Sequence, residues 1–387
     1  WEVYPGKCLP NAFRPEHLVE LNLRENMLEK LWDGTQPLTN LKMMDLSSSL
    51  KLKELPDLSY ATNLEKLVVD ICPSLVEIHS SIGNLPKLER LQMSYCKNLQ
   101  VVPTLINLAS LESVTMWGCG QFSKIPCIST NITELRITDT MLEELPESIS
   151  LWSRLQHLSI LGSATLYIFP GHTGTDIERI PDWIGDLHVL VELDIIGCPK
   201  LASLPELPRS LTTLEVDTCE SLETLESSFP LDSQIKFIKF PNCFKLGEEE
   251  ARSVITNQSL EALLPGRTMP EEFNHRATGN LLIIPSYFCK FRVCLVVSPK
   301  QQANVGFVDL FCYVRINGCP AHGNMVKKLR VPSIRAEHLF IFPYELLYED
   351  KDGWFKLEQE NEMAIHFVTS SQDMEVIECG VQNLDVP

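Results

Sequence analysis

The sequence of 387 residues has no long apolar run. Its longest uninterrupted apolar stretches, such as VCLVV at residues 293–297, are no longer than a β-strand. A helix that crosses a bilayer needs roughly 20 apolar residues, so we expect no membrane span. The chain also lacks a signal peptide and begins with Trp1 instead of methionine. We therefore expect it to be part of a longer protein.

An excess of basic residues is also lacking. The chain carries 33 Lys and Arg against 51 Asp and Glu, a net charge of −18. Residues 1–246 contribute −12 of this charge and residues 247–387 contribute −6. Surfaces that bind nucleic acid or anionic lipid are normally basic, so a protein or small-molecule partner is the better expectation.

Familiar catalytic and metal-binding patterns are missing too. There is no G-x-x-x-x-G-K-[ST] phosphate loop and no G-x-S-x-G nucleophile elbow. A cluster of possible metal ligands has cysteine intervals of 4, 17 and 6 residues, which match no common zinc pattern. Its members are Cys289, Cys294, Cys312, Cys319 and His322.

The adjacent His275 and Arg276 allow two interpretations. They are either an acid–base pair or, as we expect, a buried or capping pair in a structural turn. We predict no catalytic residue, no metal site and no cofactor in this chain.

What the sequence does contain is a repeat. An L-x-x-L-x-L segment occurs ten times, with most starts 21–24 residues apart and one interval of 35 residues. The copies begin at Leu18, Leu41, Leu64, Leu88, Leu111, Ile132, Leu155, Leu190, Leu211 and Ile235. This pattern and period are those of leucine-rich repeats. They predict an α/β-type solenoid over residues 1–246, with short parallel strands on a concave wall and an irregular, proline-marked convex side.

The repeat also accounts for about half of the 13 cysteines. One residue three positions after the last apolar strand residue recurs as cysteine, asparagine or serine. We expect it to cap backbone groups where the chain leaves each strand, as a ladder of buried structural rungs. The rungs are Asn26, Ser49, Cys72, Cys96, Cys119, Cys198, Cys219 and Cys243. A thiol ladder and an odd number of cysteines favour a reducing compartment over disulfides.

The long interval contains an insert at residues 162–176. Inserts in solenoids fall on one face, which is often the binding face. Tyr167 and Phe169 lie on this projecting loop, so we count them as candidate partner contacts. The alternative is that the loop packs its aromatic residues back onto the solenoid.

The outward strand positions supply the other candidate contacts. Most are polar, but several are large and apolar, and an apolar stripe ringed by charge is typical of an interface centre. The alternative is that the insert or a neighbouring domain covers this stripe. The candidates are Val68, Arg90, Gln92, Trp117, Arg136, His157, Ser159, Leu161, Asp194, Ile196, Glu215 and Phe237.

Residues 247–387 break the repeat. Apolar residues at helical spacing and acidic residues in the first turn predict a helix near residues 248–264. Seven β-rich runs follow, which predict an antiparallel β-sandwich without fixing its strand order. The segment YELLYEDKDGW is either a contact loop or a solvated hairpin. As contacts it offers Tyr344, Tyr348 and Trp354.

Several stretches resemble a known family. The opening LPNAFRPEHLVELNLRENMLEKLWDG is similar to the first repeats of plant TIR–NB–LRR immune receptors, with the downy-mildew resistance receptors as the best match. FKLGEEEARSVI, LLPGRTMPEEFNHRATGN and IECGVQNL resemble their post-repeat domain, a jelly-roll or immunoglobulin-like β-sandwich. The resemblance therefore covers nearly the whole chain.

This resemblance implies the sensing end of an intracellular receptor. Family members bind a pathogen effector, here expected to come from an oomycete, and then assemble into tetramers. Their ADP/ATP-binding module and NAD-cleaving TIR module lie upstream, and this chain contains neither. We therefore expect direct effector binding and no enzyme activity in this segment. The alternatives are a guard module that holds a host protein, a substrate-recruiting adaptor, and an enzyme that uses His275 and Arg276.

Overall fold

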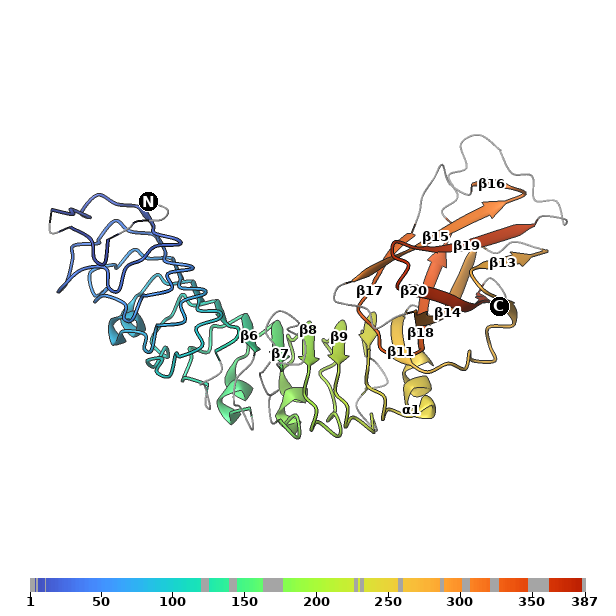
Figure 1. Ribbon diagram of the computed structural model, residues 1–387. Coiled ribbons are helices and arrows are strands. Elements are labelled where there is room, and N and C mark those ends of the chain that lie inside the picture. The colour runs from blue at the N-terminus through green and yellow to red at the C-terminus, as the bar shows by residue number, and fades with distance from the viewer. Residues whose placement is uncertain are drawn as a thin grey trace, which may run out of the picture. The chain divides into compact units, whose positions relative to one another are not determined.

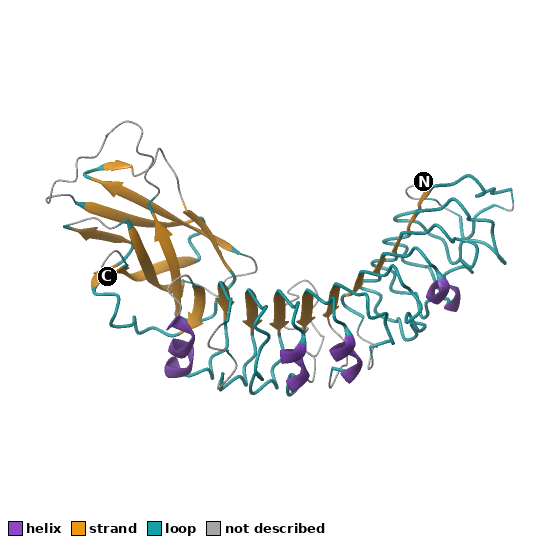
Figure 2. Cartoon of the chain, turned by 180° about the vertical axis from the view of Figure 1, so that it is seen from behind, coloured by secondary structure: helices purple, strands orange, loops and turns teal. Residues whose placement is uncertain are grey.

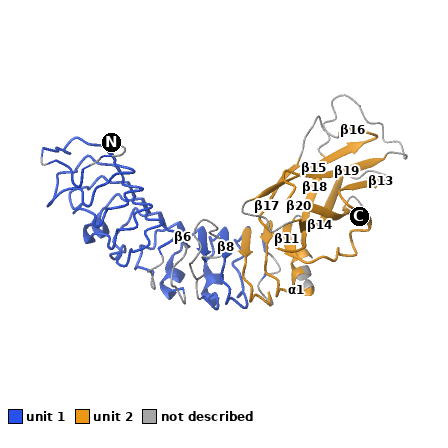
Figure 3. Cartoon of the chain, in the orientation of Figure 1, with its two compact units in different colours: residues 1–212, 226–234 blue, residues 213–225, 235–387 orange. Residues whose placement is uncertain are grey.

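The chain divides into two compact units (Figure 3). Unit 1 comprises Trp1–Thr212 and Glu226–Gln234, and unit 2 comprises Thr213–Leu225 and Ile235–Pro387. The computed structural model describes all residues except 1–3, 5, 11, 120–124, 139–144, 163–176, 226–228, 230–232, 257–259, 286–288, 301–306, 321–326, 347–361 and 385–387.

Unit 1 is a repeat solenoid with one short strand in each turn (Figure 1). The strands pair in parallel and in sequence order. They are β1 (Glu20–Asn22), β2 (Met43–Asp45), β3 (Lys66–Val68), β4 (Arg90–Gln92), β5 (Ser113–Met116), β6 (Glu134–Thr138), β7 (His157–Leu161) and β8 (Glu192–Ile196). Short 3-10 helices, η1 (Ser80–Asn84), η2 (Glu147–Leu151) and η4 (Asp182–Asp186), lie on the side opposite the strands (Figure 2).

The core of unit 1 follows from strand alternation. The second residue of each strand points inward, and parallel register places it directly beside its counterpart in the next strand, as for Leu67, Leu91 and Val114. These three side chains are fully buried. A single turn cannot cover its own apolar face, so stacking of the turns supplies the core.

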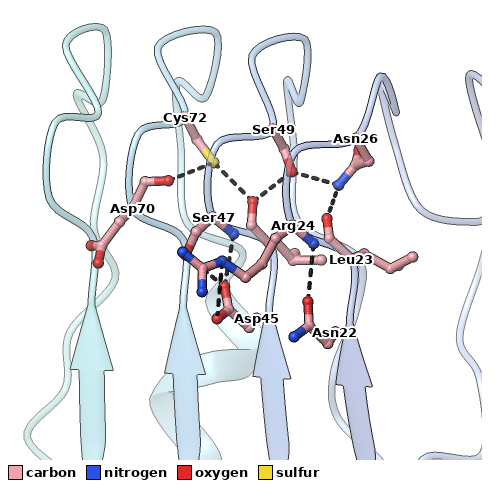
Figure 4. Close-up of polar contacts among 10 residues, drawn as sticks. Asn22, Leu23, Arg24, Asn26, Asp45, Ser47, Ser49, Asp70 and Cys72 are labelled. Atoms are coloured by element: carbon pink, nitrogen blue, oxygen red, sulfur yellow. Dashed lines mark hydrogen bonds and ion pairs between the residues drawn. The ribbon is translucent and has the colours of Figure 1, made fainter. Parts of the chain in front are cut away.

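The rung residues close each turn through hydrogen bonds to the neighbouring turn. Asn26 donates to the hydroxyl of Ser49 over 2.6 Å, and the Cys72 thiol donates to the carbonyl of Leu46 over 3.4 Å (Figure 4). Further along, Cys96 and Cys119 donate to carbonyls of the preceding turn over 3.1 and 2.9 Å. All eight rungs are buried, and all 13 cysteines are free thiols.

The residue before each rung has a positive φ. Left-handed backbone turns the chain out of the strand, and it is costly for residues other than glycine. Only two of the eight are glycines, so the rung and its hydrogen bonds must hold the other six in this conformation. The eight residues are Glu25, Ser48, Ile71, Tyr95, Gly118, Gly197, Thr218 and Asn242.

Unit 2 contains the last two repeat strands and an antiparallel region. Its first sheet has the order β9-β10-β11-β18-β14-β20-β12, with β9, β10 and β11 parallel to each other. The second sheet has the order β13-β19-β15, and both β16 and β17 pair with the far side of β15. One apolar core receives side chains from both sheets, among them Phe291, Leu295, Cys312 and Phe367.

The bounds of these strands are β9 (Thr213–Asp217), β10 (Phe237–Lys239), β11 (Glu261–Pro265), β12 (His275–Thr278), β13 (Leu281–Ile284), β14 (Lys290–Pro299), β15 (Val308–Ile316), β16 (Cys319–Pro320), β17 (Lys327–Val331), β18 (His338–Glu345), β19 (Met363–Thr369) and β20 (Met374–Asn383).

The helix predicted near residues 248–264 is too long. Helix α1 spans only Glu248–Ser253, is extended by η5 (Val254–Thr256), and gives way to strand β11. Leu263 faces the core shared by the two sheets, and the adjacent Leu264, which points to the opposite face of β11, is buried as well. A strand that is apolar on both faces has a continuous apolar run, which periodicity cannot distinguish from a helix.

Among the described residues, no helix is long and apolar enough to cross a membrane.

Candidate partner-binding site

A hollow opens on the strand side of unit 1. It has a volume of about 610 Å³ and lies across β3 to β6. Polar, charged and apolar side chains from successive turns share its wall. They are Asp70, Ile71, Arg90, Gln92, Ser94, Tyr95, Glu112, Ser113, Thr115, Trp117, Thr133, Glu134 and Arg136.

The apolar part of this hollow comes from three successive turns. Ile71 and Tyr95 directly precede their rung cysteines and have φ values of 57° and 58°. Trp117 lies at the end of β5, one residue before Gly118. The left-handed backbone at Ile71 and Tyr95 directs both side chains toward the hollow, where Ile71 remains 45% exposed.

Gly118 provides the space for the Tyr95 ring. Its φ is 63°, and a Cβ at this position would lie 2.8 Å from Cδ1 of Tyr95. Gly34 is a matched control, with a φ of 70° and nothing within 4 Å of its Cβ position. We expect Gly118→Ala to lower the free energy of unfolding by about 2 kcal/mol, but Gly34→Ala by only about 1 kcal/mol, the cost of left-handed backbone alone. Urea unfolding of both variants measures the difference, and equal losses would contradict the role of Gly118.

Most acidic groups of the hollow are already engaged. One carboxylate oxygen of Asp70 accepts the backbone N–H of Ser94 over 2.6 Å, and burial raises the pKa of Asp70. Glu134 accepts the Ser113 hydroxyl over 3.0 Å and lies 2.6 Å from Nε of Arg136. These contacts leave fewer carboxylate oxygens of Asp70 and Glu134 able to accept a hydrogen bond from a ligand.

The hydrogen-bond donors of the hollow have fewer partners among the described residues. Arg90 is exposed and, within the part of the chain that the structure describes, makes no ion pair. The indole N–H of Trp117 is buried and has no hydrogen-bond acceptor among those residues. The hollow therefore combines a free cation with aromatic and aliphatic surface, which suits a ligand that carries a carboxylate beside an apolar group.

A second group of candidates lies on β7 and β8. His157 Nδ1 lies 2.9 Å from a Glu192 carboxylate oxygen. The Ser159 hydroxyl donates to Asp194 over 2.8 Å. Leu161 and Ile196 follow these pairs at the ends of the same strands, directly opposite each other and half-buried.

The predicted exposure is wrong for two candidates on the strands. Val68 is only 5% exposed, because its short side chain stands between the longer Asp45 and Gln92 of the neighbouring strands. Ser159 is only 6% exposed, because it bonds sideways to Asp194.

The remaining candidates fall into three groups. Arg90, Gln92, Trp117 and Arg136 meet in the hollow. In unit 2, Glu215 lies 3.5 Å from Lys239, and Phe237 is 41% exposed. The last four, Tyr167, Phe169, Tyr348 and Trp354, lie outside the described residues.

Tyr344 does not lie on a loop, contrary to the prediction. It belongs to β18 and stacks on Phe291, with ring centroids 5.1 Å apart. Tyr344 lies near the end of the β-rich run that begins at His338, so the strand interpretation of this residue holds and the contact-loop interpretation does not. Burial raises the pKa of Tyr344 to about 12, as expected for a ring packed against the core.

The His275–Arg276 pair begins strand β12. The guanidinium of Arg276 donates to the carbonyls of Phe273 and Pro270, each over 2.7 Å. Arg276 thus holds the turn that precedes its own strand. Among the described residues, no group of three or more His, Cys, Asp or Glu side chains is arranged to hold a metal ion.

Only four of the 13 hollow residues were selected from the sequence, and the large apolar or aromatic ones that were missed are Ile71 and Tyr95. A usable signal was present, because both occupy the position directly before a rung cysteine. A comparison of the residue before each rung across the turns identifies two large side chains, Ile71 and Tyr95, where later turns have Gly118 and Gly197.

Comparisons with known proteins give a consistent picture. A family model described as Leucine Rich Repeat matches residues 17–36. Disease resistance proteins RML1A and RML1B from Arabidopsis thaliana are 42% and 43% identical to the chain over 99% of its length. Probable disease resistance protein RPP1 from the same plant is 31% identical over 89% of the chain.

The chain spans only about two fifths of the length of these relatives, 40% for RML1A and 38% for the other two. Among solved structures, the leucine-rich repeat domain of the type III effector XopL is 24% identical, with a TM-score of 0.38, over 59% of this chain and 70% of that chain. This TM-score is too low to support an argument about function.

Proposed function

Since the chain belongs to the plant disease resistance proteins that carry leucine-rich repeats, we propose that it is the recognition segment of an intracellular innate immune receptor. In this proposal it binds a pathogen effector protein directly. The observation that carries the proposal is the hollow of unit 1, where aromatic and aliphatic side chains lie beside Arg90, which forms no ion pair with any described residue.

The hollow suits a protein segment that presents an acidic residue next to an apolar one. Trp117 and Tyr95 offer the large, stiff contact area that dominates binding energies at protein interfaces. Arg90 offers a cation that no described residue neutralises, so a partner carboxylate pairs with it without displacing an existing contact.

We further propose that binding acts on the rest of the receptor by a shift in population. A ligand shifts an equilibrium only through its different affinities for two states. The effector would therefore bind more tightly when the repeats are released from the upstream nucleotide-binding module, and release would allow receptors to assemble into tetramers. This segment contributes recognition and no enzyme activity in this scheme.

Unit 2 has a role of its own in the proposal. We assign residues 247–387 to the family's post-repeat jelly-roll or immunoglobulin-like domain, next to repeats at residues 1–246. The two antiparallel sheets with their common core support this assignment. Loops of this domain would add contacts to the same effector.

Titration calorimetry with purified effectors tests the proposal. We expect Trp117→Ala to weaken effector binding about thirtyfold, because a central interface tryptophan typically contributes about 2 kcal/mol. Leu161→Asp should also weaken binding, since it places a charge on the apolar end of β7. Tyr60→Ala is the matched control, because Tyr60 is 57% exposed and lies outside the hollow and the strands.

Two outcomes would change this reading. Unchanged affinity in both Trp117→Ala and Leu161→Asp would place the contact elsewhere. Binding to a host protein, but to no effector, would favour a guard module that monitors that host protein.

A further inference from the structure

The two sheets of unit 2 differ in how their outward faces are covered. In the first sheet, Arg292, Cys294 and Val296 of β14 point away from the shared core, yet each is at most 3% exposed. The chain itself covers them. The guanidinium of Arg292 donates to the carbonyl of Ile255 over 3.2 Å and lies 5.7 Å from the ring centre of the buried Phe273.

The second sheet has an outward face that no described segment of the chain covers in this way. Along β13, β15, β17 and β19, alternate residues enter the core, and the residues between them point outward. The outward residues include Leu281 at 46% exposed, Ile283 at 54% and Tyr313 at 38%. Large apolar side chains at these exposures are expected to bury themselves against something.

Register places these residues side by side. Leu281 of β13 and Tyr313 of β15 both lie opposite His366 of the intervening β19. Ile283 and Arg315 likewise flank Ala364. The three strands lie side by side in the order β13-β19-β15 (Figure 1), so Leu281 and Tyr313 lie on either side of His366, and Ile283 lies across Ala364 from Arg315.

The charge of this face is opposite to that of the chain. Its outward residues include the cations Arg315, Lys328 and Arg330 and one carboxylate, Asp309. Asp309 lies 2.9 Å from Lys328 and 3.8 Å from Arg330, so this carboxylate is shared by two cations, and together with Arg315 the face keeps a surplus of positive charge. In a chain with a net charge of −18, this face is both apolar and basic.

We propose that the outward face of β13, β15, β17 and β19, defined by Leu281, Ile283, Phe311, Tyr313, Arg315 and Lys328 and named here the open face, docks an acidic protein segment. The segment carries aliphatic or aromatic side chains between carboxylates. Its apolar groups cover the three strands, and its carboxylates pair with Arg315 and Lys328.

This proposal is independent of the hollow in unit 1. It concerns other residues, and it holds whether or not an effector binds there. The partner of the open face is defined only by its chemistry, so synthetic probes can test it.

The test uses the full chain and two short fluorescent peptides. In one peptide leucine alternates with glutamate, and in the other leucine alternates with lysine. Fluorescence anisotropy should show binding of the glutamate peptide and at least about tenfold weaker binding of the lysine peptide. The double variant Ile283→Ser/Tyr313→Ser should weaken binding of the glutamate peptide about tenfold, and Arg315→Glu/Lys328→Glu should reverse the preference.

Controls make each outcome decisive. Leu50→Ser/Leu151→Ser removes two exposed apolar side chains from the repeats, at 53% and 68% exposure, and should leave peptide binding unchanged. Equal binding of both peptides, or glutamate-peptide binding that survives Ile283→Ser/Tyr313→Ser, would overturn the proposal. Sedimentation equilibrium that shows dimers dissociated by Ile283→Ser would also overturn it, in favour of a second copy.

Discussion

Replacing Asn242 by alanine is expected to lower the free energy of unfolding of unit 2 by about 4 kcal/mol. The Asn242 side chain is 3% exposed and makes three hydrogen bonds. Its amide donates to Asp217 and to the carbonyl of Ser333, each over 3.0 Å, and its carbonyl accepts the backbone N–H of Arg335 over 2.8 Å. Alanine would leave these three groups without their partner, at about 1–3 kcal/mol for each buried polar group.

Urea unfolding of the full chain, combined with hydrogen exchange of the β18 amides, measures this loss. Asn242 has a φ of 59°, so Asn242→Gly should be less destabilising than Asn242→Ala by about 1 kcal/mol, the cost of left-handed backbone for alanine. Asn98→Ala is the control, since Asn98 is exposed and donates once, to Pro73 over 2.9 Å. A loss in Asn242→Ala no larger than in Asn98→Ala would show that the network contributes nothing.

The same network explains why the compact unit begins before the repeat pattern ends. The sequence pattern changes near residue 246, but unit 2 already includes the turns around Asp217 and Asn242. These turns bond to residues 333–338, and β10 pairs directly with β11. The hydrogen bonds of Asn242 to His338 and Ser333 join residues more than 90 positions apart, and no periodicity encodes them.

Local patterns predicted the repeats because each strand and each rung obeys a short rule. The seven β-rich runs of the tail form strands as well: alternation is visible in β13, β15, β17 and β19, whereas β14 and β18 are continuous apolar runs of strand length. Strands β11, β12 and β16 were not predicted from the sequence. β12 (HRAT) and β16 (Cys319–Pro320) are too short and polar to show alternation, and β11 is apolar on both sides.

The hollow was only partly predictable. Alternation identifies which side of a strand a residue occupies, and this brought Arg90, Trp117 and Arg136 to one surface. It does not tell how far the neighbouring side chains cover that residue. The burial of Val68 was therefore not predicted. Tyr95 lies beyond the strand, where its direction depends on the positive φ of the turn.

The second large effect concerns pH. His338 is fully buried and neutral, because Nε2 accepts the backbone N–H of Asn242 over 3.0 Å and Nδ1 donates to the carbonyl of Ala336 over 2.9 Å. Burial lowers the pKa of His338 to about 4. Nearby, burial raises the pKa of Asp217 to about 6, with Glu215 acting in the same direction and Arg335 against it.

The two groups act on stability with opposite signs. Between pH 4 and 6.5 the unfolded chain protonates His338 and the folded chain does not, so the stability from His338 is lost as pH falls through this window. Asp217 is protonated in the folded state up to about pH 6 but ionised when unfolded, so its stability is lost as pH rises from about 4 to 6. The wild-type protein should therefore show a weak net dependence between pH 4 and 6.

Asp217→Asn separates the two contributions. The substituted amide oxygen still accepts from Asn242 and Thr218, but the side chain no longer ionises. We expect the variant to match the wild type near pH 4 and to exceed it by about 3 kcal/mol above pH 7, because about two pKa units correspond to that free energy. Between pH 6.5 and 4 the variant should lose about 3 kcal/mol through His338 alone.

Urea unfolding across this pH range measures both slopes. His366→Gln, an exposed change on β19, serves as the control for histidine content. A stability difference between Asp217→Asn and the wild type that stays constant from pH 4 to 7.5 would mean that Asp217 titrates normally, and that the last repeat turn is open to water at this point. If this stability difference instead grows with pH, the ionised Asp217 carboxylate lowers the stability of unit 2 at neutral pH while it accepts a hydrogen bond from Asn242. In that case, the hydrogen bond between Asp217 and Asn242 fixes the position of the turn around Asn242 although the buried charge reduces stability.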